Sequence, residues 1–161
     1  MRGKIAHDLD ESEIREIALR YLGRREYAIE ELRLKLIQRG ADSEITEQVV
    51  SDLADSDLVS DQRFTEMYLR MRIRRLFGPM KIRGELRGKG VSDKLINDAM
   101  PDGNDTWFDA ASQWARKSCR GELDYAGRAK IYRSLMNRGF SHEQANVGID
   151  NLTLDNEVSD I

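Results

Sequence analysis

The sequence of 161 residues has one cysteine, two prolines, two histidines and no long apolar run. A single cysteine, Cys119, cannot form an internal disulfide, and every apolar run is shorter than the ~20 residues that span a bilayer. The first residues also lack the continuous apolar core of a secretory signal. These absences predict a cytoplasmic protein with no membrane partner. The scarcity of proline, with 34% charged residues, favours a helix-rich chain.

Residue types that carry chemistry are also sparse. His7 and His142 lie far apart in the sequence, and with Cys119 they make neither a convincing zinc site nor a catalytic triad. No Walker-type phosphate-binding loop occurs. Trp107 and Trp114 have the spacing of a packed helical stripe, which we favour over base stacking. The sequence therefore predicts a protein that is not an enzyme and has no catalytic residues, metal site or cofactor.

Three glycines mark three copies of one pattern. Gly40, Gly90 and Gly139 are 50 and 49 residues apart, and each follows a basic residue. Leucine stands four residues before each glycine, and leucine or isoleucine stands eight before, as in a buried helical stripe. Glycine after such a stripe accepts a left-handed backbone and ends the helix. A helix-capping residue follows two positions after each glycine and predicts a new helix: Asp42, Ser92 and Ser141, the last with Gln144 in a capping box.

A longer helical stretch precedes each copy, at about residues 12–25, 62–76 and 106–120. The sequence therefore predicts an all-α protein of three tandem three-helix repeats, at residues 12–60, 61–103 and 104–152. Such short helices bury their apolar faces only when neighbouring repeats pack. We expect a flexible N-terminus at 1–11 and a flexible acidic tail at 153–161.

Positive charge is concentrated in the middle repeat. Residues 61–94 contain ten Lys or Arg against four Asp or Glu, a net charge of +6, whereas residues 1–60 and 95–161 carry −5 and −4. A field of this kind attracts a polyanion or an acidic protein surface, and guanidinium groups suit phosphate and carboxylate. A solvated helical face is the alternative interpretation. The candidate residues for binding a partner or DNA are Arg63, Arg70, Arg72, Arg74, Arg75, Lys81, Arg83, Arg87 and Lys89.

Two glycines lie inside the helix that is expected to begin at Pro79. Gly84 and Gly88 are four residues apart, so they could permit the close approach of another helix. The alternative is a locally weak helix, because each interior glycine costs about 1 kcal/mol relative to alanine.

The middle repeat resembles the RecX family of recombinase regulators. The motifs are D-x-R-F at residues 61–64, R-x-R at 70–72 and G-P-x-K-I-x-x-E-L-x-x-K-G-V at 78–91. Shorter matches are E-L-x-x-K-L-x-x-R-G at 31–40 and R-x-L-x-x-R-G-F at 133–140. The chain departs from the family where Ala28 and Ile29 replace a common capping residue, and where Gly84 and Gly88 replace polar helix formers.

The resemblance implies a curved, elongated helical array that lies in the deep groove of the RecA filament on DNA. It also implies regulation of the recombinase, commonly inhibition of its ATPase, strand-exchange and coprotease activities. Single- or double-stranded DNA is then a further partner, and we expect a monomer. The residues themselves leave a second class open, a sequence-tolerant DNA-binding helical module that acts without contacting the recombinase.

Overall fold

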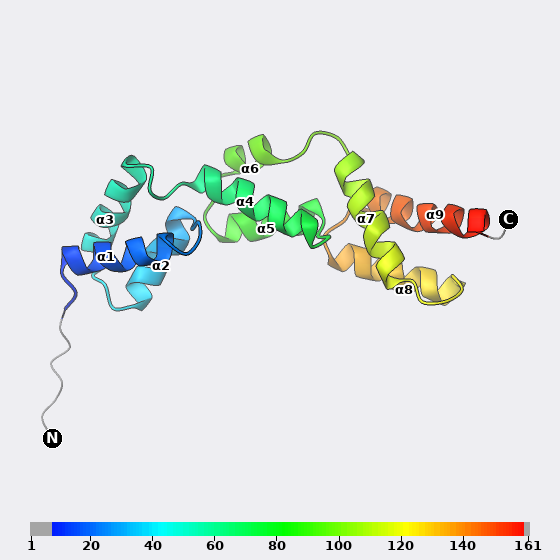
Figure 1. Cartoon of the computed structure of the whole chain (residues 1–161), viewed down its shortest axis with the longest axis horizontal. Helices are drawn as coiled ribbons and strands as arrows, with labels where there is room; N and C mark the ends of the chain where they lie inside the picture. The colour runs from blue at the N-terminus through cyan, green and yellow to red at the C-terminus, as the bar shows by residue number, and fades with distance from the viewer. Residues whose placement is uncertain (1–7, 160–161) are drawn as a thin grey trace, which may run out of the picture. The chain divides into compact units, whose positions relative to one another are not determined.

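The computed structural model describes residues 8–159, and Figure 1 traces their path. This part of the chain contains nine helices and no strand, which confirms the all-α class. Residues 1–7 of the expected flexible N-terminus, and 160–161 of the expected tail, lie outside the described residues. The helices are α1 (Glu11–Leu22), α2 (Ile29–Gln38), α3 (Ser43–Asp55), α4 (Asp61–Arg74), α5 (Pro79–Gly88), α6 (Asp93–Ala99), α7 (Asp105–Ser118), α8 (Tyr125–Asn137) and α9 (His142–Ser159).

The three predicted glycine turns are present. Gly40, Gly90 and Gly139 have φ angles of 93°, 80° and 91°, so each occupies the left-handed region that glycine adopts at low cost. At the end of α2, the Gly40 N–H donates to the Ile37 carbonyl at 2.9 Å, and the Ala41 N–H donates to the Leu36 carbonyl at 3.2 Å. This pair of bonds is a Schellman motif, and the same pattern recurs at the end of α8.

The predicted capping residues also contact the helices that they precede. Asp42 Oδ1 accepts the Glu44 and Ile45 N–H groups at 2.9 and 3.0 Å. Ser141 Oγ accepts the Gln144 N–H at 3.1 Å, and Gln144 Oε1 accepts the Ser141 N–H at 2.9 Å. The capping box that the sequence predicts before α9 is therefore formed in both directions.

The last helix is longer than the sequence indicates. The predicted third repeat ends at residue 152, whereas α9 continues to Ser159 and includes most of the expected acidic tail. Leu152 is buried, and neither glycine nor proline follows Gly148, so nothing in the local sequence stops the helix. A Cβ at Gly148 would lie 2.9 Å from the carbonyl carbon of Ala111, so glycine permits the close packing of α7 and α9.

The chain forms two compact units. Of the described residues, 8–67 and 87–95 form unit 1, and 68–86 and 96–159 form unit 2. The helices α4 and α5 each contribute residues to both units. The core of unit 1 is built from α1, α2 and α3 around residues such as Ile14, Leu32 and Leu53. The core of unit 2 includes Leu135 and Phe140 with the alanines of α7.

Candidate partner-binding surface

The nine basic candidates are divided between the two units. Arg63, Arg87 and Lys89 belong to unit 1, and all three contact carboxylates. The other six belong to unit 2, where they come from the second half of α4, from the residue that follows α4 and from the first half of α5. The structure therefore separates the single basic segment of the sequence into groups with different environments: Arg70, Arg72, Arg74, Arg75, Lys81 and Arg83 lie in unit 2.

The D-x-R-F motif at the start of α4 stabilises unit 1. Asp61 Oδ1 accepts the Ile29 N–H at 2.8 Å and so caps α2 from 32 residues away. Ala28, at the N-cap position, has no side-chain oxygen for this bond. Desolvation raises the pKa of the half-buried Asp61 carboxyl. Arg63 donates to the Glu26 carboxylate at 3.0 Å, and this hydrogen bond is the largest cause of its raised pKa, so its charge is already partnered.

The basic–glycine turn at Lys89–Gly90 docks on the first turn of α2. Lys89 Nζ lies 3.4 Å from the Glu31 carboxylate and 5.8 Å from the centre of the Phe64 ring. A Cβ on Gly90 would lie 2.7 Å from the Cβ of Glu30. Glycine therefore serves both the left-handed backbone and the close approach to α2.

The basic–glycine turn of unit 2 docks on the start of α5 in a similar way. The Gly78 N–H donates to the Arg138 carbonyl at 2.8 Å, and the Met80 N–H donates to the Gly139 carbonyl at 3.0 Å. Pro79 lies between them and has no N–H, so these bonds satisfy the first donors of α5. A Cβ on Gly78 would collide with the Gly139 backbone. The two glycines thus allow two backbones to meet directly.

Arg138 closes the C-terminal end of α4 in unit 2. Its Nε donates to the Leu76 carbonyl at 2.8 Å, and its Nη2 contacts the Arg75 carbonyl. The guanidinium lies 3.9 Å from the centre of the Phe77 ring and 3.7 Å from that of Trp114. Burial is the main cause of its lowered pKa. Arg138 was not among the predicted site residues, and its only sequence signal was the basic–glycine pattern.

Arg72 is enclosed between α4 and α5. Its side chain is only 13% exposed, and its Nε donates to the Glu85 carboxylate at 2.8 Å. The same carboxylate accepts the Tyr68 hydroxyl at 2.9 Å, and the Phe77 ring centre lies 3.7 Å from the Arg72 guanidinium. Arg72 therefore holds the two helices together and has little surface for a partner.

Five of the nine candidate cations have no carboxylate partner among residues 8–154, the part of the chain whose side chains are described. Arg70 and Arg74 are exposed and stand four residues apart, so they share one side of α4. Arg83 donates to the neutral Asn97 side chain at 2.6 Å, which leaves its charge uncompensated. These residues are termed the unpaired cations: Arg70, Arg74, Arg75, Lys81 and Arg83.

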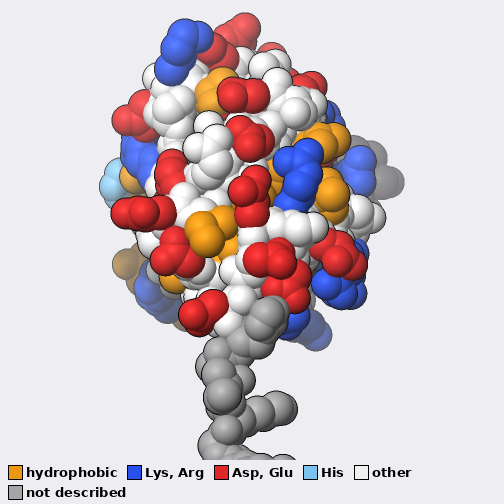
Figure 2. All heavy atoms as spheres, turned by 90° about the vertical axis from the view of Figure 1, so that its left-hand side faces the viewer, with side chains coloured by type: hydrophobic (Ala, Val, Ile, Leu, Met, Phe, Trp, Pro, Cys, Tyr) orange, Lys and Arg blue, Asp and Glu red, His pale blue; other side chains and the backbone are white. Residues whose placement is uncertain are grey.

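Acidic side chains gather on one face of unit 1 (Figure 2). Figure 2 shows a face over the N-terminal helices on which Asp and Glu side chains gather. The helix α3 contributes exposed carboxylates to unit 1 through Glu44, Glu47 and Asp55. Such a face repels phosphate, so the unpaired cations are the better candidates for contact with nucleic acid.

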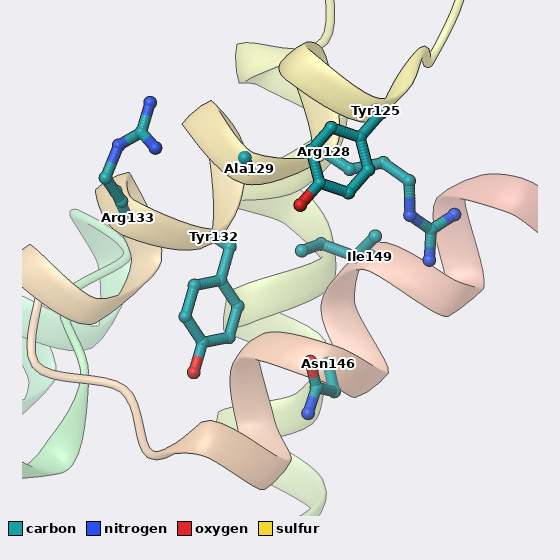
Figure 3. A pocket seen from close by; sticks show the side chains of 7 residues that line it. All are labelled: Tyr125, Arg128, Ala129, Tyr132, Arg133, Asn146 and Ile149. Carbon is teal, nitrogen blue, oxygen red and sulfur yellow. The ribbon is translucent and has the colours of Figure 1, made fainter.

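A pocket of about 310 Å³ lies between α8 and α9. Figure 3 shows Tyr125 beside Arg128 and above Ile149, whereas the Arg133 side chain extends away from both tyrosines. Arg128 turns toward Thr153 and Asp150, at 3.1 and 3.4 Å. The lining residues are Tyr125, Arg128, Ala129, Tyr132, Arg133, Asn146 and Ile149.

The described residues contain neither a membrane-spanning helix nor a metal-binding cluster. None of the helices in this part of the chain is long and apolar enough to span a membrane. Within the same residues, no three His, Cys, Asp or Glu side chains are grouped to hold a metal ion.

Comparison with known proteins identifies similar sequences over most of the chain. The family models for RecX, first three-helix domain, and RecX, second three-helix domain, match residues 15–53 and 60–100. Regulatory protein RecX of Legionella pneumophila (strain Corby) is 37% identical over 128 residues, which cover 78% of this chain and 85% of that protein. Regulatory protein RecX of Halorhodospira halophila (strain DSM 244 / SL1) is 36% identical, with coverage of 81% and 83%.

The fold has a solved counterpart. The crystal structure of RecX from Lactobacillus salivarius matches with a TM-score of 0.76 and 25% sequence identity, covering 89% of this chain and 97% of that chain. Together with the two tandem three-helix domain models, this match supports a helical repeat array.

Proposed function

Because the chain belongs to the RecX family, we propose that it binds a RecA-type recombinase filament on DNA and inhibits the recombinase. The inhibited activities are its ATPase, strand-exchange and coprotease activities. The observation that carries this proposal is the set of unpaired cations in unit 2. Guanidinium groups form paired hydrogen bonds with phosphate and carboxylate, and a nucleoprotein filament offers both.

The tandem repeats suggest how inhibition arises. A filament presents the same surface again on each successive protomer, and three related repeats at 12–60, 61–103 and 104–152 can contact more than one of them. Linked contacts raise the apparent affinity through effective concentration. A protein that braces several protomers opposes the subunit motions that accompany ATP turnover. On this proposal one molecule affects several protomers, so inhibition occurs below one molecule per protomer.

The test is the ATPase activity of purified recombinase on single-stranded DNA, with this protein titrated into the reaction. The double variant Arg70→Glu/Arg74→Glu reverses two exposed cations on one side of α4. We expect half-inhibition to require at least about tenfold more protein, because two charge contacts become repulsive. The matched control is Lys117→Glu/Arg120→Glu, which makes the same charge change at exposed positions outside the unpaired cations.

Circular dichroism establishes that both double variants keep the helical content of the parent. The proposal expects the control to inhibit like the parent. Equal inhibition by Arg70→Glu/Arg74→Glu and the parent would show that the unpaired cations are only a solvated helical face.

A second candidate function depends on the same cations. A sequence-tolerant DNA-binding module would use them on duplex phosphates without contacting the recombinase. Fluorescence anisotropy separates the two functions by measuring binding to DNA alone and to recombinase without DNA. Tight binding to DNA alone, with none to the recombinase, would favour the module.

A further inference from the structure

The first of the three basic–glycine turns, at Gly40, is not packed against the start of a helix. A Cβ at Gly40 would have no atom within 4 Å, in contrast to Gly90 and Gly139. Arg39 is exposed and makes no ion pair within residues 8–154, the part whose side chains are described, whereas Lys89 and Arg138 are half-buried. No backbone N–H in the same residues outside the helices donates to the Arg39 or Gly40 carbonyl. The space in the direction of a Cβ is therefore open at Gly40, whereas the start of a helix fills it at Gly90 and Gly139.

The two covered turns show what such a surface contacts. Each lies against the first turn of a helix, where N–H groups lack acceptors within the helix. The Gly139 carbonyl accepts the Met80 N–H near the start of α5. The Lys89 ammonium lies beside Glu31, the third residue of α2. The Gly139 turn thus offers a carbonyl to a free N–H group of α5, and the Gly90 turn offers a cation to a carboxylate in the first turn of α2.

We propose that the turn Arg39–Gly40–Ala41 docks on the first turn of a helix of the recombinase, one with Glu or Asp among its first residues. This proposal rests on the function proposed above and adds a protein contact to it. The contact lies outside the basic middle repeat, in unit 1, where the exposed acids of α3 disfavour nucleic acid.

A second copy of this chain fits the turn less well. The equivalent helix start in the third repeat is that of α8, where Asp124 already caps the helix by accepting the Gly127 N–H at 2.7 Å. Lys130 stands nine residues before Gly139, where Glu31 stands nine before Gly40. The first turn of α8 contains no acid, so it offers Arg39 of another copy no equivalent of the Glu31 that Lys89 meets at α2. This difference disfavours head-to-tail association of two copies.

The experiment measures the affinity of the full chain for recombinase filaments on single-stranded DNA, formed with a slowly hydrolysed ATP analogue. Arg39→Glu reverses the charge at the turn and should weaken binding about three- to tenfold. Arg39→Lys should bind like the parent, because lysine performs the same role at position 89. The matched control is Arg24→Glu, which changes an exposed arginine of the same unit by the same charge.

The dependence of affinity on salt identifies what Arg39 contacts. On single-stranded DNA, loss of a phosphate contact reduces the magnitude of the slope of log K against log salt by about 0.7. Loss of a carboxylate contact leaves counterion release from DNA unchanged. The proposal expects an unchanged slope for Arg39→Glu. A reduced slope would assign Arg39 to DNA and overturn the proposal.

The remaining outcomes distinguish the two proposals. If the parent binds and Arg39→Glu binds like Arg24→Glu, the turn is not a docking site, and the proposed function stands. If the parent does not bind the filament at all, the proposed function fails and this contact fails with it. Sedimentation that shows the parent self-associating, with Arg39→Glu monomeric, would assign the turn to a second copy and overturn the recombinase contact.

Discussion

Two glycines at the start and in the middle of α5 should respond to alanine in opposite directions. Gly84 is exposed inside the helix, and a Cβ there would have no atom within 4 Å. Alanine is favoured over glycine in a helix interior by about 0.5–1 kcal/mol. Gly84→Ala should therefore stabilise the protein by up to about 1 kcal/mol, equivalent to a rise in Tm of about 2–4 °C. This open space also decides for the locally weak helix over a close helix contact.

Gly78→Ala should destabilise the protein. The added methyl group would collide with the Gly139 backbone, so the start of α5 and the basic–glycine turn must separate. Separation lengthens or breaks the two bonds from Gly78 to Arg138 and from Met80 to Gly139, now 2.8 and 3.0 Å long. At about 0.5–1.5 kcal/mol for each bond, the loss is about 1–3 kcal/mol before any strain is added.

Urea unfolding followed by circular dichroism measures both effects on the full chain. Gly88→Ala provides a control, because a Cβ there is also unobstructed but Gly88 is the last residue of α5. It should stabilise by less than Gly84→Ala. Destabilisation by Gly84→Ala would refute the open environment of α5. A neutral Gly78→Ala would refute the direct backbone contact at Gly139.

Two further variants test contacts that connect distant parts of the sequence. Asp61 has a raised pKa, so its stabilising contribution is present below the ordinary aspartate pKa and is lost as the pH rises through the raised value. Asp61→Asn keeps an acceptor for the Ile29 N–H without a charge. The unfolding free energy of this variant should therefore fall less than that of the parent from about pH 4 to pH 7. A variant whose pH profile equals that of the parent would contradict this. Arg138→Gln removes the contacts with the carbonyls at the end of α4 and should lower the unfolding free energy by about 1.5–3 kcal/mol. Arg70→Gln, at an exposed site, should change the unfolding free energy by less than about 0.5 kcal/mol. Equal urea midpoints for these two variants would exclude the role of Arg138 at α4.

Local features of the fold could be predicted because they depend on residues near one another in the sequence. A left-handed glycine after an apolar i, i+4 stripe needs only the helix that it ends, and Gly40, Gly90 and Gly139 all have this conformation. The capping box of Ser141 and Gln144 likewise spans four residues. The start of α4, one residue from the predicted position, has the same local origin.

The candidate surface could be predicted only in part, because the neutralisation of a cation depends on carboxylates far away in the chain. Arg63 meets Glu26, 37 residues away, and Lys89 meets Glu31, 58 residues away. The residues next to Arg63 and Lys89 do not show which carboxylate each will meet, and Arg70 has no such partner among residues 8–154. The sequence therefore predicts nine equivalent cations, whereas the fold leaves five of them unpaired.

The sequence by itself determined three similar basic–glycine turns, each with the backbone that glycine permits. Only the tertiary structure decided that the turns at Gly90 and Gly139 cover a helix start and that the turn at Gly40 does not. The physical reason is the distance along the sequence. The turns at Gly90 and Gly139 dock on helices from the preceding repeat, α2 and α5, and a contact between residues so far apart in the sequence leaves no local pattern.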